Sequence, residues 1–183
     1  MTNTKLRIAT ELDRTFSEAG FADQGVEALR AEADVSLRTL YKHFPSREAM
    51  IVGALEHRDA AYFDWLAGGP EAGVAHILHP LVRLCDWLAE VANTGCLFLN
   101  AWAEYPESEA IAAIVTDHKA RLADEFRQRL ERVVPERDTA ALAETLFLLH
   151  EGVTQAARLQ GRERATKAAM RAARAALETE GIH

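Results

Sequence analysis

The sequence predicts an all-α protein of about nine helices, and three observations support this fold class. Alanine, leucine, glutamate and arginine dominate the composition, and all four favour helix. The chain of 183 residues has only five prolines, ten glycines and 7% aromatic residues, which argues against a β-rich fold. Apolar residues recur at helical spacing in each long segment, and 49% hydrophobic residues are enough for a real core.

The N-terminal segment has the pattern of three helices with a tight turn before the last. A helix over residues 5–19 is apolar on one face, and Gly20 is placed to end it in the left-handed conformation. A second helix over 25–33 is followed by Asp34, which tolerates the left-handed backbone of a tight turn. A third helix over 37–43 then completes a helix-turn-helix.

The third helix is short and has a stop signal at each end. Ser36 is a good N-cap, Pro45 prevents the helix from continuing, and Ser46 caps the helix that follows. A helix of about two turns is unstable alone in water, so part of its surface must be buried. The residues expected on that buried side are Leu37, Leu40 and Phe44.

The other side of this helix is basic and polar. No acidic residue occurs between Val35 and Arg47, although the chain has a net charge of −7. Cations, hydroxyls and a phenol on a short exposed helix are typical of a helix that enters a DNA groove. The predicted DNA-contacting side chains are Arg38, Thr39, Tyr41, Lys42 and His43, with Ser36 and Arg47 on the DNA backbone.

The motif Ser36-x-x-Thr39-Leu40-Tyr41-x-His43-Phe44-x-Ser46-x-Glu48 resembles the recognition helix of the tetracycline-repressor (TetR/AcrR) family of bacterial transcriptional regulators. The resemblance extends back through Gly20-Phe21 and forward to about Leu55. It implies a homodimeric repressor that a small-molecule effector releases from a palindromic DNA operator. The resemblance further implies an N-terminal DNA-binding domain over 1–58 and a ligand-binding and dimerisation domain over 59–183.

The chain departs from the family at the second helix. Threonines that commonly touch phosphate in the family are replaced here by Gln24 and Gly25. We therefore expect Gln24 or the backbone to make this phosphate contact. Arg30 replaces a usually small residue, and is either a solvated charge or an additional phosphate contact.

The remaining segments are amphipathic and contain no strand pattern. Pro80 interrupts one of them and predicts a kink. The expected helices cover residues 46–66, 71–92, 94–106, 107–133, 137–160 and 163–179.

The last two segments are apolar on more than one face, which predicts burial on more than one face. A four-helix contact between two chains satisfies this pattern, and in the resembled family these helices form the dimer interface. An internal hairpin in a monomer is the alternative. The predicted interface residues are Leu142, Leu146, Leu149, Val153, Ala165, Ala169, Ala172 and Ala176.

The C-terminal domain also contains aromatic and polar residues that are core residues by default, but the resembled family has a ligand pocket in this region. Binding cavities are mostly apolar with a few polar groups that orient the ligand. The predicted pocket residues are Trp65, Trp87, Asn100, Trp102, Tyr105, His118, Phe126, Phe147 and His150. A metal site would require several of the polar members to converge, and we predict neither a metal nor a cofactor.

The sequence contains no phosphate-binding glycine loop, paired metal cysteines or nucleophile turn, so we do not expect an enzyme. One alternative is an all-α enzyme that uses His118 and His150 as acid and base; another is a DNA-binding protein without a ligand. Cys85 and Cys96 are interpreted as buried thiols of a cytoplasmic protein, with a thiol sensor as the alternative. No basic-then-apolar signal segment or membrane-spanning run is present in the sequence.

Overall fold

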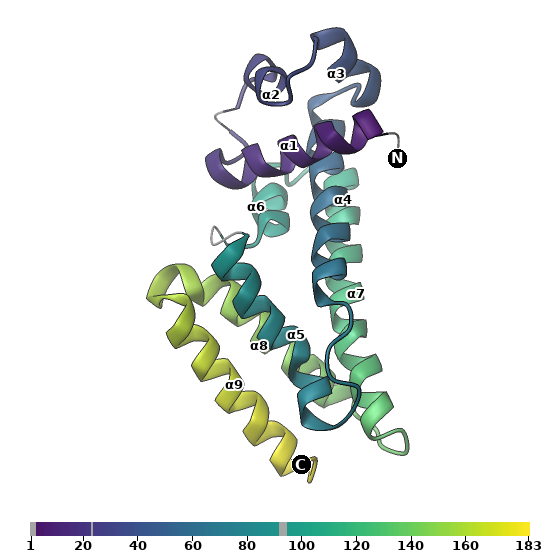
Figure 1. Cartoon of the computed structure of the whole chain (residues 1–183), viewed down its shortest axis with the longest axis vertical. Coiled ribbons are helices and arrows are strands. Elements are labelled where there is room, and N and C mark those ends of the chain that lie inside the picture. Colours follow the sequence, from purple (N-terminus) through teal and green to yellow (C-terminus); the bar gives the residue numbers. More distant parts are fainter. Residues whose placement is uncertain (1–2, 23, 92–94) are drawn as a thin grey trace. The chain divides into compact units, whose positions relative to one another are not determined.

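The computed structural model of the chain describes residues 3–22, 24–91 and 95–183. Nine helices and no strand lie within these ranges, which confirms the predicted all-α fold (Figure 1). The predicted helix ends at residues 92 and 94 lie outside the described residues. The helices are α1 (Asn3–Ala19), α2 (Val26–Glu32), α3 (Leu37–His43), α4 (Arg47–Leu66), α5 (Gly73–Glu90), α6 (Leu97–Glu104), α7 (Glu109–Val133), α8 (Ala140–Gln160) and α9 (Arg162–Thr179).

The helices pack as two compact units. The first contains the described residues up to Phe63 together with Cys96–His118, and the second contains Asp64–Gly95 together with Lys119–His183. Helices α4 and α7 each contribute residues to both units. Packing therefore groups residues 96–118 with the N-terminal helices, whereas the sequence placed them in the C-terminal domain. The domain boundary near residue 58 stays a prediction.

The first unit has a continuous apolar core drawn from α1, α2, α3, α4, α6 and α7. Each fully buried large side chain contributes about 1.5–3 kcal/mol relative to an exposed one. This core therefore fixes the short helices α2 and α3, which could not persist alone. Its largest members include Ile8, Leu12, Phe16, Leu29, Leu40, Phe44, Met50, Ile51, Leu55, Phe98 and Ile111.

In the second unit, α8 and α9 pack against each other and against α5. Gly161, with φ of 84°, makes the sharp turn between α8 and α9 in a backbone region that favours glycine. Alanines on the inner face of α9 allow the two helices to approach closely. The buried residues of α9 are Ala165, Ala169, Ala173 and Leu177.

Helix α5 continues through Pro80, whose nitrogen cannot donate to the carbonyl of His76. Arg129 of α7 takes over this role, because its Nη1 donates to the His76 carbonyl at 3.1 Å. The same guanidinium donates to the carbonyl of Leu66 at 3.2 Å and to Glu125 at 2.6 Å. The buried Arg129 thus satisfies a carbonyl that proline leaves without its helical partner.

Candidate nucleic-acid interface

The turn between α2 and α3 has the conformation predicted from its sequence. Asp34 adopts a φ of 46°, and it is the one non-glycine residue with positive φ in the described part of the chain. Two arginines close the turn: Arg7 donates to the Ala33 carbonyl at 2.7 Å, and Arg30 donates to the Val35 carbonyl at 3.3 Å. Arg30 also pairs with Glu27 at 2.8 Å, so it is more than a solvated charge, and its contact with phosphate stays a prediction.

Helix α3 begins and ends where its sequence predicts. The amide of Thr39 donates to the hydroxyl of Ser36 at 3.1 Å, which confirms the N-cap. Phe44 is extended, with φ of −137° and ψ of 90°, as expected before Pro45. The amide of Ala49 donates to Ser46 at 3.0 Å and caps α4.

Two apolar side chains hold α3 on the rest of the first unit. Leu40 has no exposed surface and Phe44 has 2% exposed surface. The ring of Phe44 lies directly on the backbone of Gly53 in α4, where an added Cβ would lie 2.2 Å from the ring. Leu37, which we expected to be buried as well, is 36% exposed, so two residues rather than three anchor the helix.

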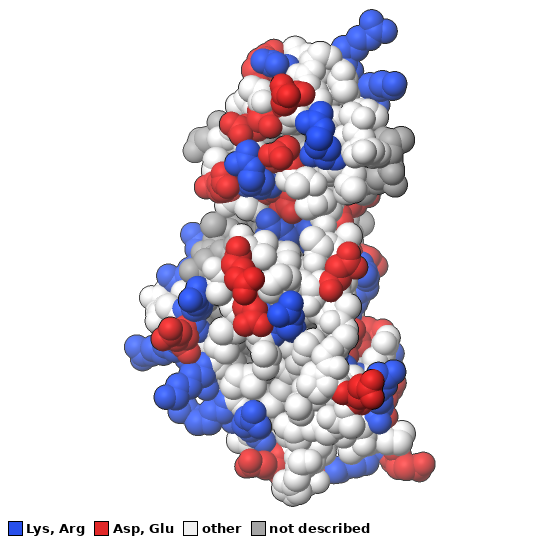
Figure 2. All heavy atoms as spheres, viewed as in Figure 1, with Lys and Arg blue, Asp and Glu red and all other residues white. Residues whose placement is uncertain are grey.

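The outer face of α3 presents the predicted polar residues. Arg38, Tyr41 and Lys42 are exposed, whereas Thr39 and His43 are half-buried. No side-chain hydrogen bond or ion pair joins Arg38, Tyr41 or Lys42 to another described residue. Lys and Arg side chains project from α3 at the upper right of Figure 2. Unpaired cations on a fixed helix are free to contact an anion.

The structure corrects the prediction that Arg47 contacts DNA, because the guanidinium of Arg47 points into the protein. It donates to the carbonyls of Phe21 and Gln24, and its Nε donates to the phenol oxygen of Tyr105 at 3.0 Å. The charged group also lies 5.8 Å from the ring centroid of Phe16. A side chain with these partners stabilises the unit, and we remove Arg47 from the DNA-contacting residues.

Gln24 and Gly25 lie at the start of α2, as predicted. The Gln24 side chain is half-buried, and Gly25 is exposed in an extended conformation, with φ of −67° and ψ of 158°. Their contact with phosphate stays a prediction. Ser36 is exposed, but its hydroxyl already caps α3.

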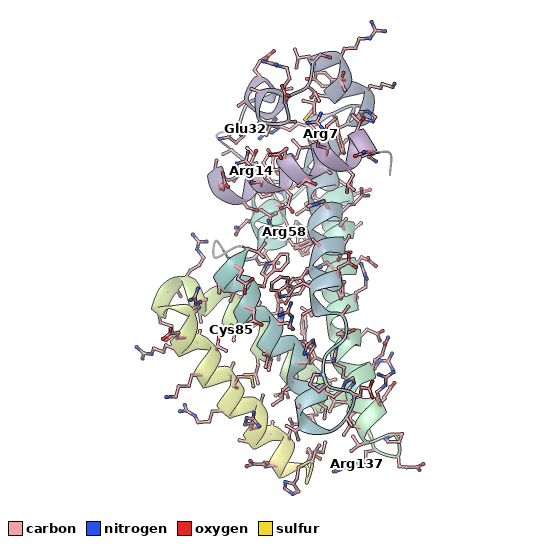
Figure 3. The ribbon with its side chains drawn as sticks, in the orientation of Figure 1. Arg7, Arg14, Glu32, Arg58, Cys85 and Arg137 are labelled. Carbon is pink, nitrogen blue, oxygen red and sulfur yellow. The ribbon has the colours of Figure 1, made fainter. Side chains whose placement is uncertain are left out.

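A buried ion pair joins α1 to α4 beneath the helix-turn-helix. Asp13 and Arg58 have 5% and 8% exposed surface, and Arg58 Nε lies 2.8 Å from Asp13 Oδ1. His57 Nδ1 lies 2.8 Å from the second oxygen of Asp13. On the neighbouring surface, Arg14 of α1 pairs with Glu32 of α2 at 2.7 Å, and Figure 3 shows both side chains. Sequence reasoning missed these pairs because partners such as Asp13 and Arg58 are far apart in the chain.

Residues 96–118 contact α4 within the first unit at three polar points. Tyr105 accepts from Arg47, Ser108 donates to Glu48, and His118 Nδ1 lies 2.8 Å from Asp59 Oδ1. The imidazole of His118 is also stacked on Phe98, with centroids 3.8 Å apart and planes 7° apart. Tyr105 and His118 therefore have defined roles inside this unit.

The nine predicted pocket residues are divided between the two units. Asn100, Trp102, Tyr105 and His118 belong to the first, and Trp65, Trp87, Phe126, Phe147 and His150 belong to the second. Asn100 and Trp102 are exposed, and Phe126 has no exposed surface. Tyr105 lines a groove of about 410 Å³ in the first unit, and Phe147 lines one of about 460 Å³ in the second.

Trp65, one of the two tryptophans of the second unit, forms a reciprocal contact with Arg83. Trp65 Nε1 donates to the Arg83 carbonyl at 2.8 Å, and Arg83 Nε donates to the Trp65 carbonyl at 3.0 Å. Trp87 lies edge-on to Trp65, with centroids 5.7 Å apart. These contacts give Trp65 and Trp87 a packing role, and their assignment to a pocket stays a prediction.

Burial corrects the predicted dimer residues. Leu142, Leu146 and Val153 of α8 are buried within a single chain, as are Ala165 and Ala169 of α9. A side chain enclosed by its own chain has no surface left for a second one. Leu149 and Ala176 are half-buried, and Ala172 is exposed. Five of the eight predicted residues are therefore buried within one chain, and a dimer contact at Leu149, Ala172 and Ala176 stays a prediction.

Within the described residues, no helix has the length and apolarity to cross a membrane. In the same residues, His, Cys, Asp and Glu side chains form no group of three or more that suits a metal ion. Cys96 is buried in the core of the first unit, whereas Cys85 is half-buried in the second. His118 and His150 belong to different units, and His150 Nδ1 lies 3.6 Å from Glu151 Oε1.

Comparison with known proteins agrees with this interface. Residues 11–54 match the model of the bacterial regulatory proteins of the tetR family, and residues 73–173 match the tetracyclin repressor-like C-terminal domain. The first match contains α2, α3 and the turn between them. The two matched regions together cover more than half of the chain.

Individual proteins are also similar to this chain. The HTH-type transcriptional regulator UidR of Escherichia coli is 24% identical over 159 residues, which cover 82% of this chain and 79% of UidR. The nucleoid occlusion factor SlmA of Colwellia psychrerythraea is 34% identical over 137 residues, 68% of this chain and 67% of SlmA. The TetR-family regulator SCO4454 of Streptomyces coelicolor shares the fold, with a TM-score of 0.86, 24% identity and coverage of 96% and 95%. The chain therefore belongs to the tetR family of bacterial regulatory proteins and is a DNA-binding transcriptional regulator.

Proposed function

We propose that this regulator is a homodimer that represses transcription from a palindromic operator and leaves it when a small molecule binds. The observation that carries the DNA-contacting part is the exposed face of α3, where Arg38, Tyr41 and Lys42 have no partner among the described residues. Their helix is held by Leu40 and by Phe44 on Gly53, so it offers a rigid surface to a major groove. Arg38 and Lys42 supply phosphate or base contacts, and Tyr41 supplies a hydroxyl and an aromatic ring.

The dimer contact that we propose uses the outer faces of α8 and α9. Leu148 and Leu159 of α8 are 59% and 88% exposed, and Gly152 lies on the same face between them with open space above it. On α9, three small exposed residues recur at helical spacing: Ala168, Ala172 and Ala175. A symmetric contact between two copies would cover these residues and place two α3 helices on one DNA duplex.

The release step that we propose passes through residues 96–118. Tyr105 and His118 join this segment to Arg47 and Asp59 of α4, in the same unit that carries α3. A ligand that moves the segment would therefore disturb the base of the reading helix. To reverse a 99:1 population, the effector must favour the DNA-incompetent state by roughly 10⁴-fold. The acidic chain favours a neutral or cationic effector over an anionic one.

Selection of bound fragments from a pool of random duplex DNA tests this proposal. We expect enrichment of a palindrome whose half-sites are about one helical turn, or 10 base pairs, apart or a multiple of it. A compound that weakens binding to the selected site should shift tryptophan emission over the same concentration range. Enrichment of an asymmetric single site would refute the dimer model, and absence of any enrichment would refute sequence-specific binding by this chain.

A further inference from the structure

Two exposed arginines of the second unit that lie outside α9 are paired with carboxylates. Arg127 pairs with Asp124 and Glu131, and Arg137 pairs with Glu180. On helix α9, all five cations are exposed and have no hydrogen-bond or ion-pair partner among the described residues. Four of them lie on one face and are called the α9 stripe: Arg164, Lys167, Arg171 and Arg174.

The α9 stripe forms one continuous line of positive charge. Its members recur at intervals of three and four residues, so they share one face of the helix over about 15 Å. Glu163 is the one acidic residue between Arg158 and Arg174, in a chain whose net charge is −7. Figure 2 shows Lys and Arg atoms gathered at the lower left, where α9 lies in Figure 1.

Dimerisation through α8 and α9 would leave this charge in place. The proposed dimer face on α9, formed by Ala168, Ala172 and Ala175, lies beside the stripe rather than on it. Acidic residues are scarce on the exposed faces of the two helices: they are Glu144, Glu163 and Glu178. A second copy therefore brings another positive stripe and few carboxylates, so dimerisation would leave the stripe available to an anionic partner.

We propose that the α9 stripe is a second DNA-binding surface, which contacts phosphates without reading sequence. The inference rests on the DNA-binding function of this regulator, because a protein bound to its operator lies close to the phosphates of duplex DNA. Three of the four cations are arginines, whose planar guanidinium binds phosphate through two parallel hydrogen bonds. The side chains between them are mostly alanine, which cannot read base edges and offers little apolar depth for insertion into a lipid surface.

The test compares two variants of the full-length chain with equal loss of charge. The first replaces three stripe residues: Lys167→Gln, Arg171→Gln and Arg174→Gln. The control replaces three other exposed arginines of the second unit: Arg127→Gln, Arg132→Gln and Arg137→Gln. Glutamine preserves helix propensity, and the replaced side chains are exposed, so both variants should fold. Binding to a duplex of random sequence is measured at several salt concentrations.

The stripe variant should bind random duplex DNA more weakly, and the slope of log affinity against log salt should fall in magnitude by about 3. The control should keep the slope of the wild type. In a chain with Arg38→Ala, Tyr41→Ala and Lys42→Ala, the stripe should account for the remaining DNA binding, which separates this inference from a failure of α3. Equal slopes for the stripe variant and the control would overturn the proposal. Binding of both variants to poly-glutamate is measured as well. If the stripe variant loses binding to poly-glutamate while its DNA binding is unchanged, the stripe binds an acidic protein segment, and the proposal of a DNA-binding surface is overturned.

Discussion

The guanidinium of Arg47 donates from Nε to the phenol oxygen of Tyr105 at 3.0 Å, across 58 positions of sequence. Its other nitrogens donate to the carbonyls of Phe21 and Gln24, which both lie in the link between α1 and α2. One side chain therefore joins the start of α4, the link before α2 and the residue after α6. We therefore expect Arg47 to influence DNA binding through its support of this unit, without contacting DNA itself.

Replacement of Arg47 by leucine should lower the free energy of unfolding by about 2–4 kcal/mol, because hydrogen bonds to a charged donor are lost and two carbonyls lose their partner. Operator affinity should fall as well, since α3 loses part of its support. Thermal unfolding followed by circular dichroism measures the first effect. Arg132→Leu, at an exposed arginine, is the matched control and should change stability by less than about 0.5 kcal/mol. Weaker operator binding at unchanged stability would return Arg47 to the DNA-contacting set.

Substitution of Gly53 by alanine should displace α3, because the new Cβ would lie 2.2 Å from the Phe44 ring. We expect a loss of about 1–3 kcal/mol in stability, as for other overpacked cores, together with a loss of operator affinity. Gel-shift titration measures the affinity. The double variant Gly53→Ala with Phe44→Leu makes room for the methyl group and should recover part of both losses. No recovery in the double variant would mean that the ring contact does not position α3.

Introduction of a charge at Leu148 should dissociate the proposed dimer. Leu148→Glu places a carboxylate at the centre of the exposed face of α8, where dimerisation would bury it unpaired at a cost of several kcal/mol. Sedimentation at micromolar concentration should show a monomer for this variant and a dimer for the wild type. The control Ala113→Glu, on an exposed position of α7, should remain a dimer. A Leu148→Glu dimer would exclude this face as the interface.

The stability of the second unit should depend on pH through Glu151. Burial alone would raise the pKa of Glu151, but the interaction with His150 and the nearby charge of Lys119 outweigh it and lower the pKa from 4.5 to about 2. Lys119 Nζ lies 2.8 Å from the carboxylate. Because the folded pKa is lower than the unfolded one, this stabilisation is present above pH 4.5 and is lost as the pH falls toward 2.

Glu151→Gln should therefore reduce stability by about 2–3 kcal/mol at neutral pH and by progressively less between pH 4.5 and 2. Urea unfolding at a series of pH values measures this difference. Glu178→Gln, at an exposed position on α9, is the control and should show little difference at any pH. A constant difference between wild type and Glu151→Gln down to pH 2 would contradict the assigned ion pair.

Local features of the fold could be predicted because their signals lie within a few residues of one another. Ser36 caps the helix that begins at the next residue, and Asp34 and Gly20 adopt the left-handed conformations that their turns require. Pro45 ends α3 by restricting the residue before it. Each of these interactions joins residues that are close together in the chain, so it can be predicted from a short stretch of sequence.

Long-range packing could not be predicted from the same signals. The apolar stripe of Leu142, Leu146 and Val153 was assigned to a second chain, but it packs inside one chain. Periodicity shows that a face is buried without showing what buries it. Arg47 is a similar case, because its partners are backbone carbonyls and a phenol far away in sequence, and carbonyls have no sequence signature.

The most direct test of the central claim, that the exposed face of α3 contacts the operator, is a binding titration on the selected palindrome. The wild type is compared with the variant Arg38→Ala, Tyr41→Ala and Lys42→Ala at several salt concentrations. Removing two cations should lower the salt slope by about 2 per protomer, and the preference for the palindrome over random DNA should disappear. Circular dichroism should show the same helix content and melting behaviour for both proteins, since all three side chains are exposed. Equal affinity and equal specificity of the two proteins would show that another surface contacts the operator.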